Sequence, residues 1–328
     1  MSDLLHAWAP LAPMLWVAAA GLVMMLVDAW VKEKAELGMM TFVICLAGAG
    51  ISLGLWDETL DPSMLVTSRG TQWLAADRLG LFIDVAVLSG TGLAALLAGG
   101  YLREHGLERG EFYVLMLFSA LGAMALGRAN DVLALFVALE TLSLGVYGLV
   151  AFRRASPRAA EGAIKYFLLG SFASAILLFG SALLYGATNH TDLPGIATAI
   201  ANNDADMRLV ILGMLLVIVG LGFKVSAVPF HMWTPDAYEG AVTPATTFMA
   251  VVVKAATFAV ILRMFFVAFT HESLGQEGSG WPPAIAGLAA VTMIVGNVAA
   301  LVQKSVKRML AYSSIAHAGL ILVGVVAA

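Results

Sequence analysis

Ten long apolar runs divide the chain, and they restrict its fold more than any other feature of the sequence. A helix needs about 20 apolar residues to cross a bilayer core about 30 Å thick, so each run predicts one membrane-spanning helix. Only 12% of the residues are charged, against about 25% in soluble domains. We therefore expect an all-α polytopic membrane protein, and not a soluble enzyme, a disordered chain or a nucleic-acid binder. The predicted helices cover residues 11–31, 38–56, 78–101, 111–128, 131–152, 160–187, 208–228, 244–269, 283–302 and 307–327.

The chain offers few residues for a metal or redox centre. Its one cysteine, Cys45, lies in an apolar run and cannot by itself form a disulfide framework, a thiolate zinc site or an iron–sulfur cluster. The six histidines are scattered and lack the spacings typical of haem or zinc ligands. We expect no metal, no redox cofactor and no catalytic residue in this chain.

The distribution of Lys and Arg between the loops predicts the orientation. The loops after the first, third, fifth and ninth predicted helices carry Lys32, Lys34, Arg103, Arg109, Arg153, Arg154, Arg158, Lys304, Lys307 and Arg308. The loops on the other side carry Arg69, Arg78, Arg128 and Arg208, and the loops near 57–77 and 188–207 are polar. Because cytoplasmic loops are rich in Lys and Arg, both termini are expected on the periplasmic side of a bacterial inner membrane. The first run lacks a small-residue cleavage site and is expected to be a retained span.

Charged residues inside the spans are the candidates for function. A charge at the bilayer centre costs about 2.5–3.5 kcal/mol or more, so it usually faces a protein or water interior and often serves transport. Glu140 lies nine residues after Asp131, and Lys254 lies ten residues after Pro244, which follows the expected N-cap Thr243. At 1.5 Å per residue both lie about 13–15 Å deep, near the middle of the membrane. A static charge that neutralises a lysine is the alternative role for Glu140.

Lys224 lies within a run that predicts a broken helix. The segment Gly220–Pro229 holds two glycines and a proline around this buried cation, and membrane helices break where the freed backbone lines a cavity or an ion path. His231 follows the expected break, and its side chain titrates near physiological pH. For His231, a structural role and a proton-carrying role remain equally open.

Two further side chains have open roles. Lys165 lies one helical turn after Glu161, and an ion pair or snorkelling toward the cytoplasm explains it as well as transport does. His317 has polar neighbours at Ser313 and Ser314, and packing or proton relay would both fit. Three other charges receive no transport role: Asp28 and Arg263, expected at the membrane interface, and Asp84, which the sequence leaves unexplained.

Three motifs, in order, resemble the antiporter-like membrane subunits of respiratory complex I. Glu161–Gly186 reads EGAIKYFLLGSFASAILLFGSALLYG, Gly222–Pro244 reads GFKVSAVPFHMWTPDAYEGAVTP, and Lys307–Gly319 reads KRMLAYSSIAHAG. The second motif is most similar to the N branch of the family, because the M and L branches carry other residues around a shared His-x-Trp-x-Pro-Asp core. The resemblance covers about residues 110–328 strongly, and the first three helices mainly in pattern.

The resemblance implies a fold of two inverted five-helix repeats, each with a broken helix. Three peripheral helices would occupy residues 1–105, the first repeat with its broken seventh helix would occupy 106–270, and 271–328 would begin the second repeat. The family places a final, proton-ejecting lysine on its twelfth helix, which this chain does not reach. We therefore expect the chain to be the front part of a longer subunit.

The resemblance also implies a function. Glu140 would tune Lys224, Lys254 would pass protons sideways, and Lys165 and His317 match charged positions of the sixth and tenth helices. The chain would be a proton-translocating membrane-arm subunit of NADH–quinone oxidoreductase, in contact with neighbouring antiporter-like subunits and the lipid bilayer. NADH, FMN, iron–sulfur clusters and quinone would bind elsewhere in that complex. The alternatives are a subunit of a cation/proton antiporter or a membrane-bound hydrogenase, and a scaffold subunit whose buried charges only hold helices together.

Overall fold

The fold is an all-helical bundle, and the expected ten spans are confirmed. The computed structural model describes residues 7–328 except 32–33, 35, 59, 67–69 and 276–279. Within these residues ten helices are long and apolar enough to cross a membrane, so the chain is a multi-pass membrane protein. They are Ala9–Asp28 (a 3₁₀ turn and α2, Ala12–Asp28), α3 (Glu36–Gly54), α4 (Arg78–Glu104), α5 (Glu111–Arg128), α6 (Val132–Val150), α7 (Pro157–Thr188), α9 (Met207–Val225), Thr243–Ala268 (α11, Thr243–Phe248, to α12, Lys254–Arg263, with π turns after each), α14 (Trp281–Leu301) and α15 (Val306–Ala327).

Short polar side chains fix where several of these helices begin. A helix leaves its first N–H groups without partners, and an Asp or Ser just before it can accept hydrogen bonds from them. Asp77 accepts from Gly80 N at 2.8 Å at the start of α4, and Asp131 accepts from Leu133 N at 2.7 Å at the start of α6. Ser156 caps α7 in the same way. The polar residues between apolar runs therefore set the helix boundaries that hydropathy alone leaves open.

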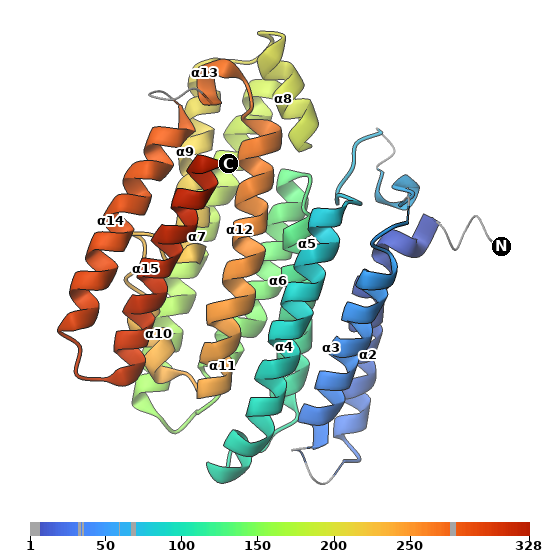
Figure 1. The fold of residues 1–328 in the computed structure, drawn as a ribbon, viewed down its shortest axis with the longest axis vertical. Coiled ribbons are helices and arrows are strands. Elements are labelled where there is room, and N and C mark those ends of the chain that lie inside the picture. Colours follow the sequence, from blue (N-terminus) through green and yellow to red (C-terminus); the bar gives the residue numbers. More distant parts are fainter. Residues whose placement is uncertain (1–6, 32–33, 35, 59, 67–69, 276–279) are drawn as a thin grey trace.

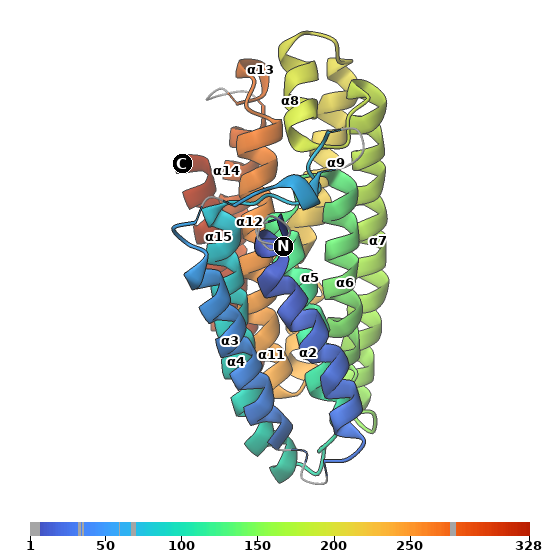
Figure 2. The same cartoon turned by 90° about the vertical axis from the view of Figure 1, so that its right-hand side faces the viewer.

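The helices run roughly along one long axis (Figures 1 and 2), with α2 and α15 on opposite sides of the bundle in Figure 1. Helices α2, α3 and α4 form one flank, α14 and α15 form the other, and α5, α6, α7, α9 and α12 lie between them (Figure 1). Two shorter helices, α8 (Leu193–Ala201) and α13 (Glu272–Gly275), stand at one end of the bundle, which we call the α8 end.

Helix α8 corrects the expectation of a polar loop at 188–207. Asp192 accepts a hydrogen bond from Gly195 N at 2.8 Å, and Pro194 lies in the first turn, where a proline costs the helix no hydrogen bond. Leu193 and Ile196 turn inward and are buried. The polar residues around this stretch therefore cap a short amphipathic helix rather than form a loop.

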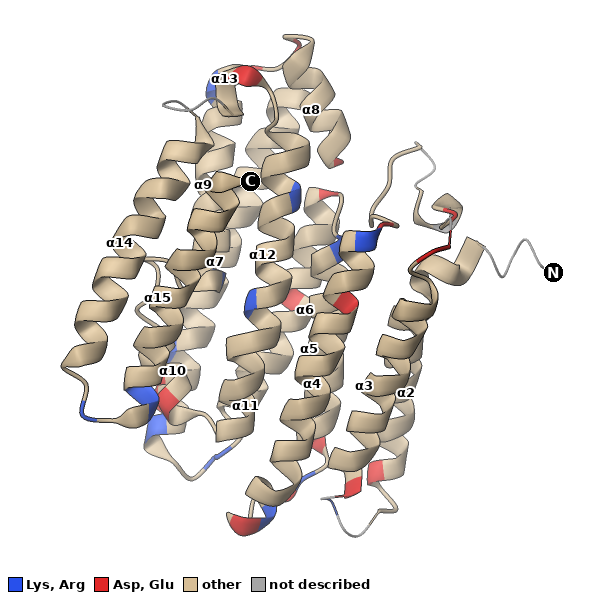
Figure 3. Ribbon diagram, viewed as in Figure 1, with Lys and Arg blue, Asp and Glu red and all other residues tan. Residues whose placement is uncertain are grey.

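Charged residues gather at the two ends of the bundle, with a few at mid-height (Figure 3). Arg128, counted above among the loop residues, is instead buried and pairs with the equally buried Asp84. Its Nη1 also donates to Pro10 O at 2.8 Å, which joins the start of the first span to α5. The pairing explains Asp84, because a carboxylate can be buried in a membrane helix when a guanidinium lies against it.

A second arginine is also buried in an ion pair. Arg263 is only 5% exposed, and its guanidinium binds both carboxylate oxygens of Asp77 at 2.6 and 2.7 Å. Its Nε donates to Gly127 O at 2.8 Å, so α12, α4 and α5 meet at this point. Lys32 and Arg69, which entered the predicted orientation, lie outside the described residues.

Candidate functional site

The seventh span breaks after Val225, as the glycines and proline predicted. Ser226 adopts a left-handed conformation with φ of 65°, and the chain resumes as the short helix α10 (Thr234–Gly240). The freed backbone finds partners inside the protein, because Trp233 Nε1 donates to Phe223 O at 3.1 Å. Across the gap, Thr234 Oγ1 donates to Ser226 Oγ at 2.7 Å. Such satisfied backbone is the condition under which a helix can be interrupted within a membrane.

Lys224 lies one residue before the end of α9 and is almost fully buried, with 2% of its surface exposed. Its Nζ donates to Ser143 Oγ on α6 at 2.7 Å and lies 5.4 Å from the ring centres of Tyr147 and Tyr166. Aromatic faces and the carbonyl end of a helix both attract a cation. Lys224 is therefore held by a hydroxyl, two rings and a helix dipole.

Glu140, Ser143 and Tyr147 form one stripe of α6 that serves this lysine. Residues spaced by three and four lie on the same helical face, so these three side chains point the same way. Glu140 Oε1 and the Tyr147 hydroxyl are buried, and neither has a hydrogen-bond partner within the part of the chain that the structure describes. Lys224 bonds to Ser143 rather than to Glu140, so the carboxylate influences the lysine through space and not by a direct ion pair.

Lys254 lies directly after a π turn, Met249–Val253, in the eighth span. Its Nζ donates to both the backbone oxygen and the hydroxyl of Ser314 on α15, each at 2.6 Å, and the residue is 6% exposed. π turns are rare and occur often at functional sites. This span begins at Thr243, with Val242 at the N-cap. Thr243 is therefore the first helical residue and not the N-cap, contrary to prediction, and its backbone oxygen accepts a hydrogen bond from the Thr247 hydroxyl at 3.1 Å.

The two histidines occupy different surroundings. His231 lies in the break, half-buried, with its ring centre 6.4 Å from that of Tyr312 on α15. Its Nδ1 is buried and has no partner among the described atoms. His317 is exposed, and its Nδ1 lies 2.8 Å from Ser313 O on its own helix. His231 therefore lies near α15, the helix whose Ser314 binds Lys254. The ring of His317 instead lies against the backbone of α15, its own helix.

Lys165 lies apart from the two buried lysines, at the end of the bundle opposite α8. Its expected pair with Glu161 is confirmed at 2.6 Å, and its Nζ also binds Asp236 at 2.7 Å. Arg308 binds the same Asp236 at 2.5 Å and Glu239 at 3.2 Å. We call these five side chains the Asp236 cluster. It ties α7, α10 and α15 together across a surface that is partly exposed.

The sequence did not reveal that Ser143 and Ser314 each bind a buried lysine. The helical spacing from Glu140 to Ser143 and Tyr147 was the available signal, because it marks one polar stripe on an apolar helix. Nothing in the spacing pointed to Asp236 as the shared partner of Lys165 and Arg308.

Comparison with known proteins places this arrangement in a family. A family model described as NADH:quinone oxidoreductase/Mrp antiporter, TM, matches residues 129–328. "NADH-quinone oxidoreductase subunit N 1" of Sorangium cellulosum (strain So ce56) is 51% identical over 99% of this chain and 66% of that protein. "NADH-quinone oxidoreductase subunit N" of Myxococcus xanthus (strain DK1622) is 42% identical over 97% and 60%. The chain thus spans somewhat under two thirds of the length of these curated relatives.

Solved structures of membrane complexes contain chains with the same fold. A chain of respiratory complex I from Thermus thermophilus with bound aureothin superposes with a TM-score of 0.76 at 34% identity, over 95% of this chain and 64% of that one. A chain of the archaeal membrane-bound sulfane sulfur reductase gives 0.76 at 25% identity, over 98% and 64%. A chain of the Mrp complex from Dietzia sp. DQ12-45-1b gives 0.79 at 22% identity, over 97% and 59%, which shows a shared fold. With its broken seventh span and its family match over residues 129–328, this chain belongs to the NADH:quinone oxidoreductase/Mrp antiporter transmembrane family.

Proposed function

We propose that this chain belongs to a proton-conducting, N-type membrane-arm subunit of NADH–quinone oxidoreductase in a bacterial inner membrane. The start of α2 and the α8 end would face the periplasm, and the Asp236 cluster would face the cytoplasm. The names of the relatives and the family match support this assignment. The partners would be the adjacent antiporter-like subunits of the membrane arm.

The observation that carries the proposal is the pairing of the two buried lysines with neutral groups. Lys224 and Lys254 donate to serines, whereas the buried arginines Arg128 and Arg263 are paired with aspartates. A guanidinium stays protonated in proteins and suits a permanent ion pair, while a buried lysine exchanges its proton readily. The chain therefore separates charges that hold helices together from charges that are able to gain and lose protons.

The depth of the lysines fits a path across the membrane. Ser143, the partner of Lys224, lies twelve residues after Asp131, about 18 Å from the α8 end of α6 at 1.5 Å per residue. Lys254 lies eleven residues after Thr243, about 16 Å from the opposite end of its span. Both therefore lie in the middle of a core about 30 Å thick, where neither can reach water by snorkelling.

The groups between the lysines would carry protons sideways. Lys224 lies at the start of the break, His231 lies within it near Tyr312, and Ser314 on α15 binds Lys254. The buried oxygen of Glu140 and the buried nitrogen of His231 are placed where bridging water would bind, because buried polar atoms normally have a partner. The charge state of Glu140 would influence proton uptake at Lys224 through space, because charges interact more strongly in a low-dielectric interior than in water.

Redox chemistry elsewhere in the complex would drive this transfer. We place NADH, FMN, the iron–sulfur clusters and quinone in other subunits, which agrees with a sequence whose single cysteine lies in an apolar run. The chain itself would respond to charge changes passed along the membrane arm. Its contribution would be the position and proton occupancy of Lys224 and Lys254.

The test compares variant complexes in sealed membrane vesicles. Lys224→Ala and Lys254→Ala should lower the protons moved per NADH oxidised several-fold while the complex still assembles. Lys304→Ala, at an exposed loop lysine, is the matched control and should leave the ratio unchanged. An unchanged ratio in both buried variants would refute the proposal. Loss of assembly would favour the scaffold role, and sodium-dependent transport without NADH would favour an antiporter.

A further inference from the structure

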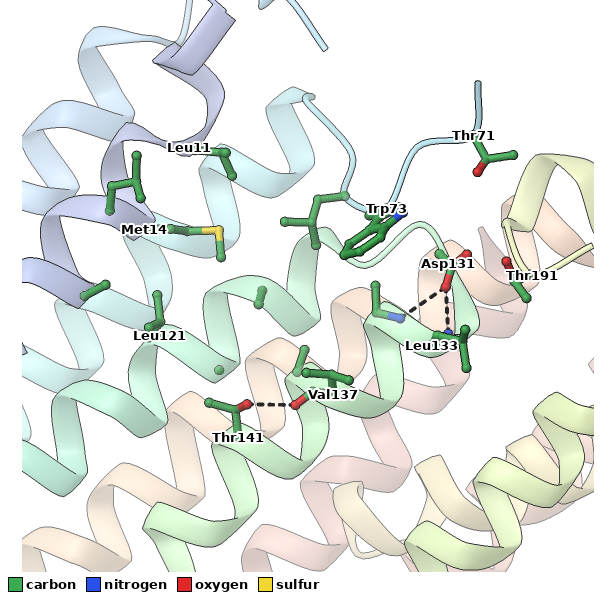
Figure 4. Close-up of a pocket in the computed structure, with 17 residues that line it drawn as sticks. Leu11, Met14, Thr71, Trp73, Leu121, Asp131, Leu133, Val137, Thr141 and Thr191 are labelled. Atoms are coloured by element: carbon green, nitrogen blue, oxygen red, sulfur yellow. Dashed lines mark hydrogen bonds between the residues drawn. The ribbon is translucent and has the colours of Figure 1, made fainter. Parts of the chain in front are cut away.

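A groove of about 740 Å³ lies between α2, α5, α6 and the segment 71–74 (Figure 4). The volume is within the range of about 300–1,000 Å³ that is typical of sites for small molecules. Met14 and Leu121 line it from α2 and α5, and Leu133 and Val137 line it from α6. None of the lysines or histidines discussed above contributes to this lining, so the groove is separate from the proposed proton path.

The length and depth of the groove match one leaflet of a bilayer. Its lining on α6 extends from Asp131, at the first residue before the helix, to Thr141. Ten residues of helix span about 15 Å, which is half of a hydrocarbon core about 30 Å thick. The groove therefore begins at the membrane surface on the α8 side and ends at mid-membrane.

The polarity of the lining changes along this depth. Thr71, Trp73, Asp131 and Thr191 lie together at the α8 end, as Figure 4 shows, and below them the walls are almost wholly apolar. Thr141, the polar residue at the deep end, donates its hydroxyl to Val137 O at 2.8 Å on its own helix. The groove is therefore polar at headgroup level and apolar at acyl-chain level, and an exposed Trp is typical of that boundary.

The groove is open on the side of the bundle that would face the lipid bilayer. Val137 is 63% exposed, Leu133 is 54% exposed and Leu15 is 46% exposed, and all three line the groove. A ligand that reaches these side chains at membrane depth comes from the bilayer. A phospholipid is the amphiphile whose polar and apolar parts lie at these two depths.

We propose that the groove binds one acyl chain of a phospholipid from the leaflet at the α8 end, with the headgroup beside Thr71, Asp131 and Thr191. The chain would fill the space between α2 and α6 and bridge the flanking helices to the first repeat. This inference requires only that the helices span a membrane, and it does not depend on proton transfer.

The experiment uses the assembled protein in membranes that contain phosphatidylethanolamine with a diazirine at the middle of one acyl chain. After irradiation, mass spectrometry locates the labelled residues. In the unsubstituted chain, labelling of the groove residues should saturate at a low fraction of labelled lipid. Labelling around Leu144, a 61% exposed residue of α6 outside the groove, should rise in proportion to that fraction.

Two matched substitutions on α6 complete the test. Val137→Trp fills the groove from its open side and should lower groove labelling at least fivefold, whereas Leu144→Trp should leave it unchanged. If groove labelling rises in proportion to the labelled lipid, or if Val137→Trp leaves it unchanged, the groove holds no specific lipid and the proposal fails. The saturation measurement decides the question even where Val137→Trp impairs assembly.

Discussion

Removing either partner of the buried Asp84–Arg128 pair should destabilise the protein strongly and unequally. Both side chains are essentially inaccessible, at 0% and 1% exposure, so a single substitution leaves one charge without its partner in a low-dielectric interior. Breaking a buried pair in this way costs about 3–5 kcal/mol. Asp84→Asn leaves a guanidinium, which cannot lose its proton, facing only neutral acceptors in the described structure, namely the new amide oxygen and Pro10 O. We expect this variant to lose about that amount near neutral pH.

Arg128→Gln should behave differently, because the carboxylate that it leaves behind can be neutralised by a proton. The cost should therefore stay below about 3–5 kcal/mol, the cost of a pair broken to an uncompensated charge, and it should shrink further as the pH is lowered, because a proton removes the buried charge. The double variant Asp84→Asn with Arg128→Gln buries no charge. Its loss should therefore fall short of the sum of the two single losses by about 1–3 kcal/mol.

Reversible unfolding in mixed detergent micelles, measured by circular dichroism for the four proteins at two pH values, gives these free energies. Equal and pH-independent losses in the two single variants would refute the reasoning, as would strict additivity. Losses under about 1 kcal/mol would show that the pair behaves as a solvated surface bridge.

Three further predictions concern other parts of the bundle. Burial alone would raise the pKa of the Asp77 carboxyl, but its arginine partner lowers that pKa below the usual range. The stability that Asp77 contributes is therefore present above about pH 4 and lost below it. When the free energy of unfolding is measured against falling pH, the Asp77→Asn variant should lack that loss. Gly122→Ala should cost about 1–3 kcal/mol in the same unfolding assay, because its Cβ would lie 2.4 Å from a backbone nitrogen of α6, whereas Gly100→Ala, with open space around it, should cost nothing. Ser314→Ala removes one of the two acceptors of Lys254. Because a hydrogen bond to a charged group contributes about 1.5–3 kcal/mol, the number of protons moved per NADH oxidised should fall while the complex still assembles. An unchanged number would contradict the role of that hydroxyl.

The sequence predicted the spans well because the hydropathy of a membrane-spanning helix is a property of one continuous segment and does not depend on its neighbours. Twenty apolar residues in a row have few other structures available in a membrane, and the polar residues between runs then cap the helices. The expectation failed at α8, where a short amphipathic helix has the composition of a loop. It also failed for Arg128, since proximity to a helix end does not reveal that an aspartate from another helix lies opposite. For the same reason it supplied no partner for Arg263.

For the candidate site, the sequence supplied residues but not partners. Lys224 and Lys254 stood out because a cation in an apolar run is conspicuous, and the break near Lys224 followed from glycine and proline. Their partners Ser143 and Ser314 lie 81 and 60 residues away, and helix packing brings them together. Local spacing carries no information about which faces of distant helices meet.

The two ends of α10 are fastened by different kinds of interaction, and salt distinguishes them. At its start, Thr234 and Trp233 are held by buried hydrogen bonds between neutral groups, on which ionic strength has little effect. Further along, Asp236 and Glu239 are held by the partly exposed cations of the Asp236 cluster. The Debye length falls from about 10 Å at 0.1 M salt to about 3 Å at 1 M, so salt weakens only the second attachment. Concentrated salt should therefore loosen the far end of α10 and leave the break itself in place.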